Sequence, residues 1–272
     1  MSSFQVTPTR VELFVPPGTE KEFEIALTNQ TGKSATFVLG AEDLAPANNP
    51  EGDSLLLGKN VGPHSLKDYI LSPTNTVTLA DGETRSVSFV VSVPMEVTKP
   101  GLYGAVTIEL GGNRQVQADA GALVRSRLAV GVLVSTVEQP EISGHLVDFE
   151  TINGSHVLWS SQTTFKIAYQ NDGNVHIEPT GLLSLSDVLG RQVAEEQIGP
   201  IVILPMSTRS QTLSVNSGYV PGRLAAHLQI EDGFGGHHEE RDITLWIMPW
   251  QNLLVLAGLV VVVLLWRKAK KI

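Results

Sequence analysis

The sequence predicts an all-β protein of two tandem β-sandwiches, followed by a single C-terminal transmembrane helix. Three observations lead to this fold class. The 25 Gly and 15 Pro residues divide the 272-residue chain into short segments, apolar and polar residues alternate within many of these segments, and a long apolar run lies near the end of the chain. Outside that run no long amphipathic helical pattern is present, so strands should form the ordered part.

Strict alternation marks the clearest strands. In "KEFEIALTN", "TRSVSFVVSVP" and "TTFKIAYQN" every second residue is large and apolar, which is typical of a strand with one buried face. The third segment ends at Asp172-Gly173, a dipeptide that favours a turn. The residues predicted to point inward are Phe23, Ile25, Leu27, Val87, Phe89, Val91, Val93, Phe165, Ile167 and Tyr169.

Three blocks of sequence recur in the same order in the two halves of the chain. "LTNQTGK" is matched by "YQNDGN", "VTLADGETRS" by "VILPMSTRS", and "KPGLYGAVTIE" by "VPGRLAAHLQIE". Chance similarity between turn-rich β sequences is the alternative to a true repeat. Two copies of a module of roughly 100 to 135 residues with seven or eight short strands each predict two immunoglobulin-like sandwiches.

These patterns set the predicted domain organisation. The first sandwich should cover residues 1–138 and the second residues 142–248, with a short linker at residues 139–141, where Pro140 favours an extended step. Residues 249–266 should form the membrane-spanning helix, and residues 267–272 a basic tail.

The N-terminal segment "FQVTPTRVELFVPPG" predicts a strand on a sheet edge. Pro8 cannot donate a backbone hydrogen bond, so the segment should bend there, and it can cross from one sheet to the other. An edge strand of this kind can pair with a strand from a partner protein. Phe4 and Val6 are the candidate residues for that pairing.

The first module is longer than the second in one place. Gly32 and Val77 are 45 positions apart, whereas the matching Gly173 and Val202 are 29 apart. The surplus lies in a loop over residues 41–73, and loops of that length are usually either functional or disordered.

The loop contains the candidate binding residues. Tyr69 offers a ring that could stack on a sugar, Lys67 and Asp68 offer hydrogen bonds, and Leu55 and Leu57 are apolar. One interpretation is a ligand or partner site, and the other is a loop that only packs on its own sandwich.

Catalytic and metal-binding patterns are weak. The chain has no cysteine and no motif of a nucleophile elbow or a phosphate-binding loop. The one cluster of potential metal ligands is His237, His238, Glu239, Glu240 and Asp242, whose spacing fits a solvated hairpin tip better than a metal site. The sequence therefore predicts a protein that is not an enzyme and holds no metal and no cofactor.

The apolar run from Trp250 to Trp266 contains eleven Leu and Val residues and is just long enough to span a bilayer as a helix. Pro249 suits the first turn of this helix, and the two Trp residues suit the membrane interfaces. A buried core helix is the alternative. The basic residues that follow predict a cytoplasmic C-terminus; they are Arg267, Lys268, Lys270 and Lys271.

Charge and the N-terminal residues complete the predicted location. A formal net charge of −9 argues against nucleic acid as the partner. "MSSFQVTPTR" has no signal-peptide pattern, so a leader is expected to have been removed. We therefore expect a single-pass protein of a bacterial plasma membrane with an extracellular ectodomain that also contacts membrane lipid.

In this order, the blocks "FQVTPTRVEL", "SLKDYI", "VTLADGETRSVSFVVSVP", "KPGLYGAVTIEL" and "YQNDGNVHIEPTGLLSLSDVLGR" resemble the bacterial WxL-interacting surface proteins. That resemblance implies a non-catalytic, membrane-anchored cell-surface protein that binds cell-wall peptidoglycan, a surface protein partner, or both. A structural stalk or assembly subunit of a larger envelope complex is the alternative function.

Overall fold

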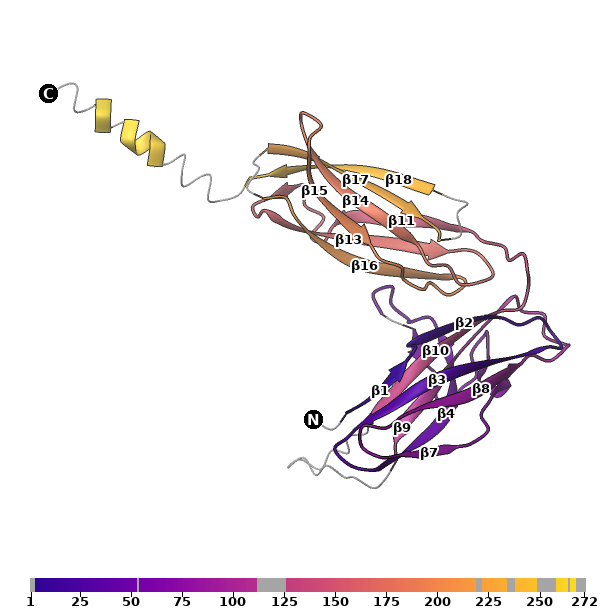
Figure 1. Ribbon diagram of the computed structural model, residues 1–272. Coiled ribbons are helices and arrows are strands. Elements are labelled where there is room, and N and C mark those ends of the chain that lie inside the picture. Colours follow the sequence, from indigo (N-terminus) through magenta and orange to yellow (C-terminus); the bar gives the residue numbers. More distant parts are fainter. Residues whose placement is uncertain are drawn as a thin grey trace. The chain divides into compact units, whose positions relative to one another are not determined.

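The computed structural model describes residues 3–52, 54–111, 126–218, 222–233, 238–248, 258–263 and 265–267. The chain forms two compact units, each built from strands packed in two layers (Figure 1). The first unit comprises residues 1–48, 52–141 and 173–176, and the second comprises residues 49–51, 142–172 and 177–272. The predicted all-β class with immunoglobulin-like sandwiches is confirmed, whereas the predicted ends of the two domains stay a prediction.

The first unit packs two sheets face to face. One sheet has the strand order β1-β3-β8-β6, and the other has the order β2-β10-β9-β4-β5, with β7 also paired to β4. The strands are β1 (Ser3–Thr7), β2 (Arg10–Phe14), β3 (Glu20–Gln30), β4 (Ala35–Ala45), β5 (Leu55–Leu56), β6 (Ile70–Leu71), β7 (Thr76–Leu79), β8 (Thr84–Ser92), β9 (Gly101–Leu110) and β10 (Arg127–Ser135). A short 3₁₀ turn, η1 (Lys67–Tyr69), precedes β6.

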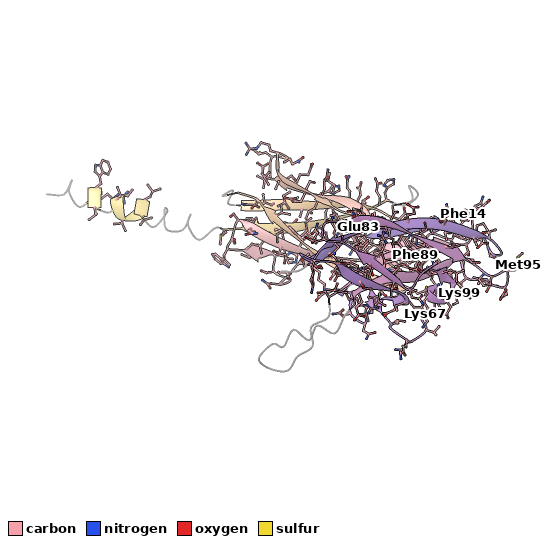
Figure 2. The ribbon with its side chains drawn as sticks, turned by 60° about the horizontal axis from the view of Figure 1, so that its bottom comes forward. Phe14, Lys67, Glu83, Phe89, Met95 and Lys99 are labelled. Carbon is pink, nitrogen blue, oxygen red and sulfur yellow. The ribbon has the colours of Figure 1, made fainter. Side chains whose placement is uncertain are left out.

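The predicted inward residues of β3 and β8 form the centre of the first core. The rings of Phe23 and Phe89 stack with their centroids 5.5 Å apart, and Ile25, Leu27 and Val91 are also buried. Figure 2 shows Phe89 inside the layered strands and Met95 at one end of the unit. β3 and β8 are neighbours in one sheet, and Phe23 lies directly opposite Phe89 on its inner face, as the alternation predicts.

The second unit repeats this arrangement. Its sheets have the orders β11-β13-β16 and β12-β18-β17-β14-β15. The strands are β11 (Gly144–Thr151), β12 (Val157–Leu158), β13 (Gln162–Asn171), β14 (Thr180–Asp187), β15 (Gln192–Ile198), β16 (Ser207–Asn216), β17 (Gly222–Glu231) and β18 (His238–Ile247). Phe165, Ile167 and Tyr169 of β13 are buried, as predicted, and Phe149 stacks on Phe165.

The internal repeat is confirmed by the strand pairings. β3 pairs with β8 as β13 pairs with β16, and β4, β9 and β10 follow one another in their sheet as β14, β17 and β18 do. In both copies the last strand also has a parallel neighbour, β2 beside β10 and β12 beside β18. The recurring sequence blocks therefore encode one topology used twice.

The predicted crossing of the N-terminal strand is also confirmed. β1 pairs with β3 in one sheet, and after Pro8 the chain continues as β2, which pairs with β10 in the other sheet. In the second unit β11 and β12 are divided between the two sheets in the same way.

The prediction of a membrane-spanning helix over residues 249–266 is wrong for the part of the chain that the structure describes. There the helical residues are 258–263 and 265–267, and no helix has both the length and the apolar character needed to cross a membrane. Sequence hydropathy measures apolar content, whereas the two helical stretches that the structure describes contain six and three residues. Pro249, Trp250, Lys268, Lys270 and Lys271 lie outside the described residues, whereas Trp266 and Arg267 are exposed.

Candidate strand-pairing edge

β1 forms one edge of the first sandwich, with Phe4 and Val6 facing inward. Both side chains are 8% exposed and belong to the core, and Phe4 lies against Phe37 with ring centroids 5.1 Å apart. Asn29, which is opposite Phe4, donates its backbone N–H to Glu83 on the far side of β3. Because backbone groups alternate in direction along an antiparallel ladder, those of Phe4 and Val6 point away from β3.

The first half of β10 forms a second open edge in the other sheet. β9 pairs with β10 along its whole length, but β2 pairs only with the residues from Gly131 to Ser135. On that side of β10, no strand within the described residues pairs with Arg127–Val130. β1 approaches β10 here before the chain crosses to β2, so the two open edges lie on the same side of the sandwich.

The direction of the free backbone groups follows from their neighbours. The N–H of Gly131 donates to Thr9 at 3.1 Å, and the carbonyl of Ser135 accepts from Val15 at 2.9 Å. Odd-numbered residues of β10 therefore direct their backbone groups toward the β2 side. The N–H and C=O groups of Arg127 and Ala129 consequently face the open edge.

The inward side of this open edge is apolar. Leu128 shares a face with Val130, which is fully buried, but Leu128 itself is 37% exposed because no strand covers it. Leu110 of the adjacent β9 packs against the same core. We call Arg127–Val130, together with β1, the pairing edge. Within the part of the chain that the structure describes, it combines backbone groups that have no ladder partner with an apolar inner side, which is what an incoming strand needs.

At the corresponding edge of the second unit, the charged side chain of Glu239 occupies a backbone group. β12 covers only Trp246 and Ile247 of β18. On the neighbouring edge strand β11, a carboxylate oxygen of Glu239 accepts the backbone N–H of Leu146 at 2.9 Å, and the ladder is irregular at that point. Charged residues and irregularities of this kind protect edges against strand pairing.

The long loop is bound to its own sandwich through Asp43. This carboxylate is fully buried and accepts the backbone N–H groups of Leu66 and Lys67 at one oxygen and of Gly62 at the other, each at 2.9 Å. Burial alone would raise the pKa of Asp43, but these donors and the Ser65 hydroxyl outweigh it and lower the pKa. The loop is therefore anchored to the fold.

The five loop residues predicted to bind a ligand lie on β5, just after it at Leu57, and on η1. Lys67 donates its ammonium group to the carbonyls of Lys59 and Asn60 within the loop, and Tyr69 packs partly against the core. Asp68 and Leu55 are exposed and Leu57 is half-buried. Lys67 is labelled in Figure 2. A binding role for these residues stays a prediction.

The candidate metal cluster lies at the β17–β18 hairpin. His238 faces Glu231 across the hairpin at 3.2 Å, and Asp242 lies 2.6 Å from His227. Glu240 is within hydrogen-bond distance of Gln229. These side chains thus pair across the two strands. His237 lies outside the described residues.

Sequence reasoning placed Phe4 and Val6 on an edge strand but overlooked β10. The signal that could have revealed it is the alternation in "RLAVGVLVS", where Leu128 continues the apolar face of Val130 and Val132. That Leu128 is uncovered depends on where β2 stops pairing, which only the three-dimensional structure shows.

No family model and no curated protein sequence matches the chain. Among solved structures, it is similar to the class 5 fimbriae chaperone CfaA, with 12% identity, 91% of this chain and 100% of that chain covered, and a TM-score of 0.45. It is also similar to the Pseudomonas aeruginosa CupB2 chaperone (12% identity, 89% and 100% covered, TM-score 0.41). A third match is a chaperone–tip adhesion subunit complex of Acinetobacter baumannii Csu pili (9% identity, 91% and 100% covered, TM-score 0.42).

These matches correct the resemblance drawn from sequence. The matching structures are pilus and fimbrial chaperones, so the interpretations as a WxL-interacting surface protein and as a membrane-anchored, wall-binding protein are wrong, as is the predicted membrane location. The quoted motifs were turns and strands, which many β-sandwiches share. The prediction of a non-catalytic protein agrees with these matches. Identities this low show similarity of fold alone.

Proposed function

We propose that this protein is a non-catalytic binding protein that holds an extended segment of another polypeptide at the pairing edge of its first sandwich. The incoming strand would lie beside Arg127–Val130 and continue the line of β2 along β10. The observation that carries this proposal is the row of outward backbone groups on Arg127 and Ala129 next to the uncovered Leu128.

The size of the edge defines what the partner must bring. Arg127 and Ala129 offer two donors and two acceptors, and at about 0.5–1.5 kcal/mol net per hydrogen bond they contribute about 2–6 kcal/mol. A micromolar complex needs about 8 kcal/mol after the cost of association. The partner strand must therefore also bury apolar side chains over Leu128, each of which contributes about 1.5–3 kcal/mol.

A protein partner is also compatible with the comparisons. Two further similar structures are a chaperone–tip adhesin complex of CFA/I fimbriae and the Salmonella enterica pilin SafA in complex with the chaperone SafB. Such partners are protein subunits, as the proposal requires for this chain. The likeness is one of fold, however, so the proposal rests on the pairing edge itself.

A fluorescent ten-residue peptide with alternating Val and Thr tests the proposal on the full chain. Leu128→Glu should weaken binding at least ten-fold, because a charge would face the apolar side of the incoming strand. The matched control is Leu56→Glu, since Leu56 of β5 is 38% exposed and lies away from this edge. Far-UV circular dichroism checks that both variants fold.

Hydrogen exchange locates the bound peptide. The amides of Arg127 and Ala129 should become protected when the peptide binds, and a version of the peptide with Pro in place of every second Thr should give no protection. Unchanged binding by Leu128→Glu, or protection elsewhere in the chain, would overturn the proposal. Loss of binding in Leu56→Glu alone would favour the long loop as the site.

A further inference from the structure

β16 is an edge strand, whereas β8, its counterpart in the first unit, has a neighbouring strand on each side. In the first unit, Ile70 and Leu71 of β6 pair with the outer side of β8. β6 belongs to the long loop, the second module is shorter in that region, and none of the described strands takes the place of β6 beside β16. β13 is its only ladder partner among the described residues.

The composition of β16 leaves this edge unprotected. Residues 210–216 read "SQTLSVN", with no charge, proline or glycine. The other long edge strands of the second unit are protected, since β15 exposes Glu195 and Glu196 and β11 carries Asp148 at a ladder irregularity. The one charged residue of β16, Arg209, precedes this segment. Natural proteins rarely leave an uncharged edge segment bare unless something pairs with it.

The outward backbone groups of β16 are identified by one contact. The N–H of Ser210 donates to the carbonyl of Pro50 at 2.7 Å, and both residues belong to the second unit. Ser210 therefore directs its backbone groups away from β13, and by alternation so do Thr212, Ser214 and Asn216. The Pro50 contact also shows that this edge accepts backbone partners.

We propose that β16 pairs with β16 of a second copy of this chain, antiparallel about a two-fold axis at Ser214. Ser214 would then face its own copy, and Thr212 would face Asn216. On the inner face Leu213 would meet Val215, an apolar pair. Three outward residues per copy give about six backbone hydrogen bonds, and the Ser210–Pro50 contact is retained.

Charge makes self-pairing more favourable at β16 than at the other edge strands of the second unit. Self-pairing of residues 210–216 brings no like charges together, whereas self-pairing of β15 would place Glu195 and Glu196 beside their copies. One strand pair makes a small interface, so the dimer should be weak, with dissociation at about 10–1000 μM. Because each copy has a net charge of −9, added salt should strengthen it.

The absence of cysteine allows a direct test of the two-fold axis. Ser214 is exposed, and in an antiparallel pair the two Ser214 residues would lie about 5.5 Å apart at Cα, within the range for a disulfide. Ser214→Cys in the full chain should form a covalent dimer under mild oxidation at least ten-fold faster than Val147→Cys. Val147 is a control on the opposite edge of the same sheet and is 46% exposed.

Charge reversal tests the same axis without oxidation. Ser214→Lys and Ser214→Asp should each weaken the dimer at least ten-fold in sedimentation velocity, and mixing the two variants should restore it. Equal crosslinking of Ser214→Cys and Val147→Cys would overturn the proposal. So would a dimer that neither charge variant weakens, because its contacts must then lie elsewhere, for example in the apolar C-terminal segment.

This inference is independent of the proposed function. The pairing edge lies in the first unit and β16 in the second, so substitutions at Leu128 and at Ser214 affect separate measurements. Failure of peptide binding leaves the dimer testable, and the reverse also holds.

Discussion

Replacing Asp43 with alanine should lower the stability of the first unit and leave that of the second unchanged. The carboxylate accepts three backbone N–H groups from the long loop and is fully buried. In Asp43→Ala these donors lose their acceptor, and water cannot replace it unless the loop opens. The loop also contributes Leu66, which is fully buried in the first core.

The cost follows from the three contacts. A hydrogen bond to a charged group contributes about 1.5–3 kcal/mol, and part of the loss is recovered when the loop relaxes into water. We therefore expect Asp43→Ala to lower the free energy of unfolding by about 3–5 kcal/mol. With a urea dependence of about 2 kcal/mol per molar, the midpoint should fall by about 1.5–2.5 M.

Two spectroscopic probes distinguish the units. All four Trp residues lie in the second unit, so Trp fluorescence follows that unit, whereas far-UV circular dichroism follows both. In Asp43→Ala an early transition should appear by circular dichroism while the fluorescence transition stays in place. Asp68→Ala, in the same loop but exposed, should change stability by less than about 0.5 kcal/mol. A loss below about 1 kcal/mol in Asp43→Ala would refute the view that this carboxylate anchors the loop.

Three further predictions concern the pKa of Asp43, the buried amide of Asn29 and the carboxylate of Glu239. The lowered pKa of Asp43 means that its carboxylate stabilises the fold above the unfolded pKa and that this contribution is lost as the pH falls through the folded pKa. Urea midpoints of the first unit should thus drop below about pH 4, less steeply in Asp43→Asn. Asn29→Ala should cost about 2–4 kcal/mol by circular dichroism, because the buried amide donates to the carbonyls of Lys33, Leu79 and Ala80. Glu239→Leu should let the Val–Thr peptide protect the amide of Leu146 from exchange, and unchanged exchange there would show that Glu239 is not the guard.

Local patterns in the sequence predicted most of the strands but little of the site. Burial of one face imposes a period of two on residues such as Phe23 and Ile25, so the strands could be read directly. Pro8 likewise revealed the change of sheet. The exposure of Leu128 depends on a pairing between residues more than 100 positions apart, which no local pattern encodes. Hydropathy of the C-terminal run measured apolar content, whereas none of the described helices is long and apolar enough to cross a membrane.

The two copies of the module differ mainly in which edge they leave open. In the first copy, β6 covers the outer side of β8, and the side next to β10 is apolar and open. In the second copy, Glu239 guards the matching edge beside β11, and the outer side of β16 is bare. An edge strand left open without a partner promotes aggregation, so each remaining opening needs an occupant. The two proposals together therefore assign one pairing edge to each sandwich, β10 for a foreign strand and β16 for a second copy of this chain.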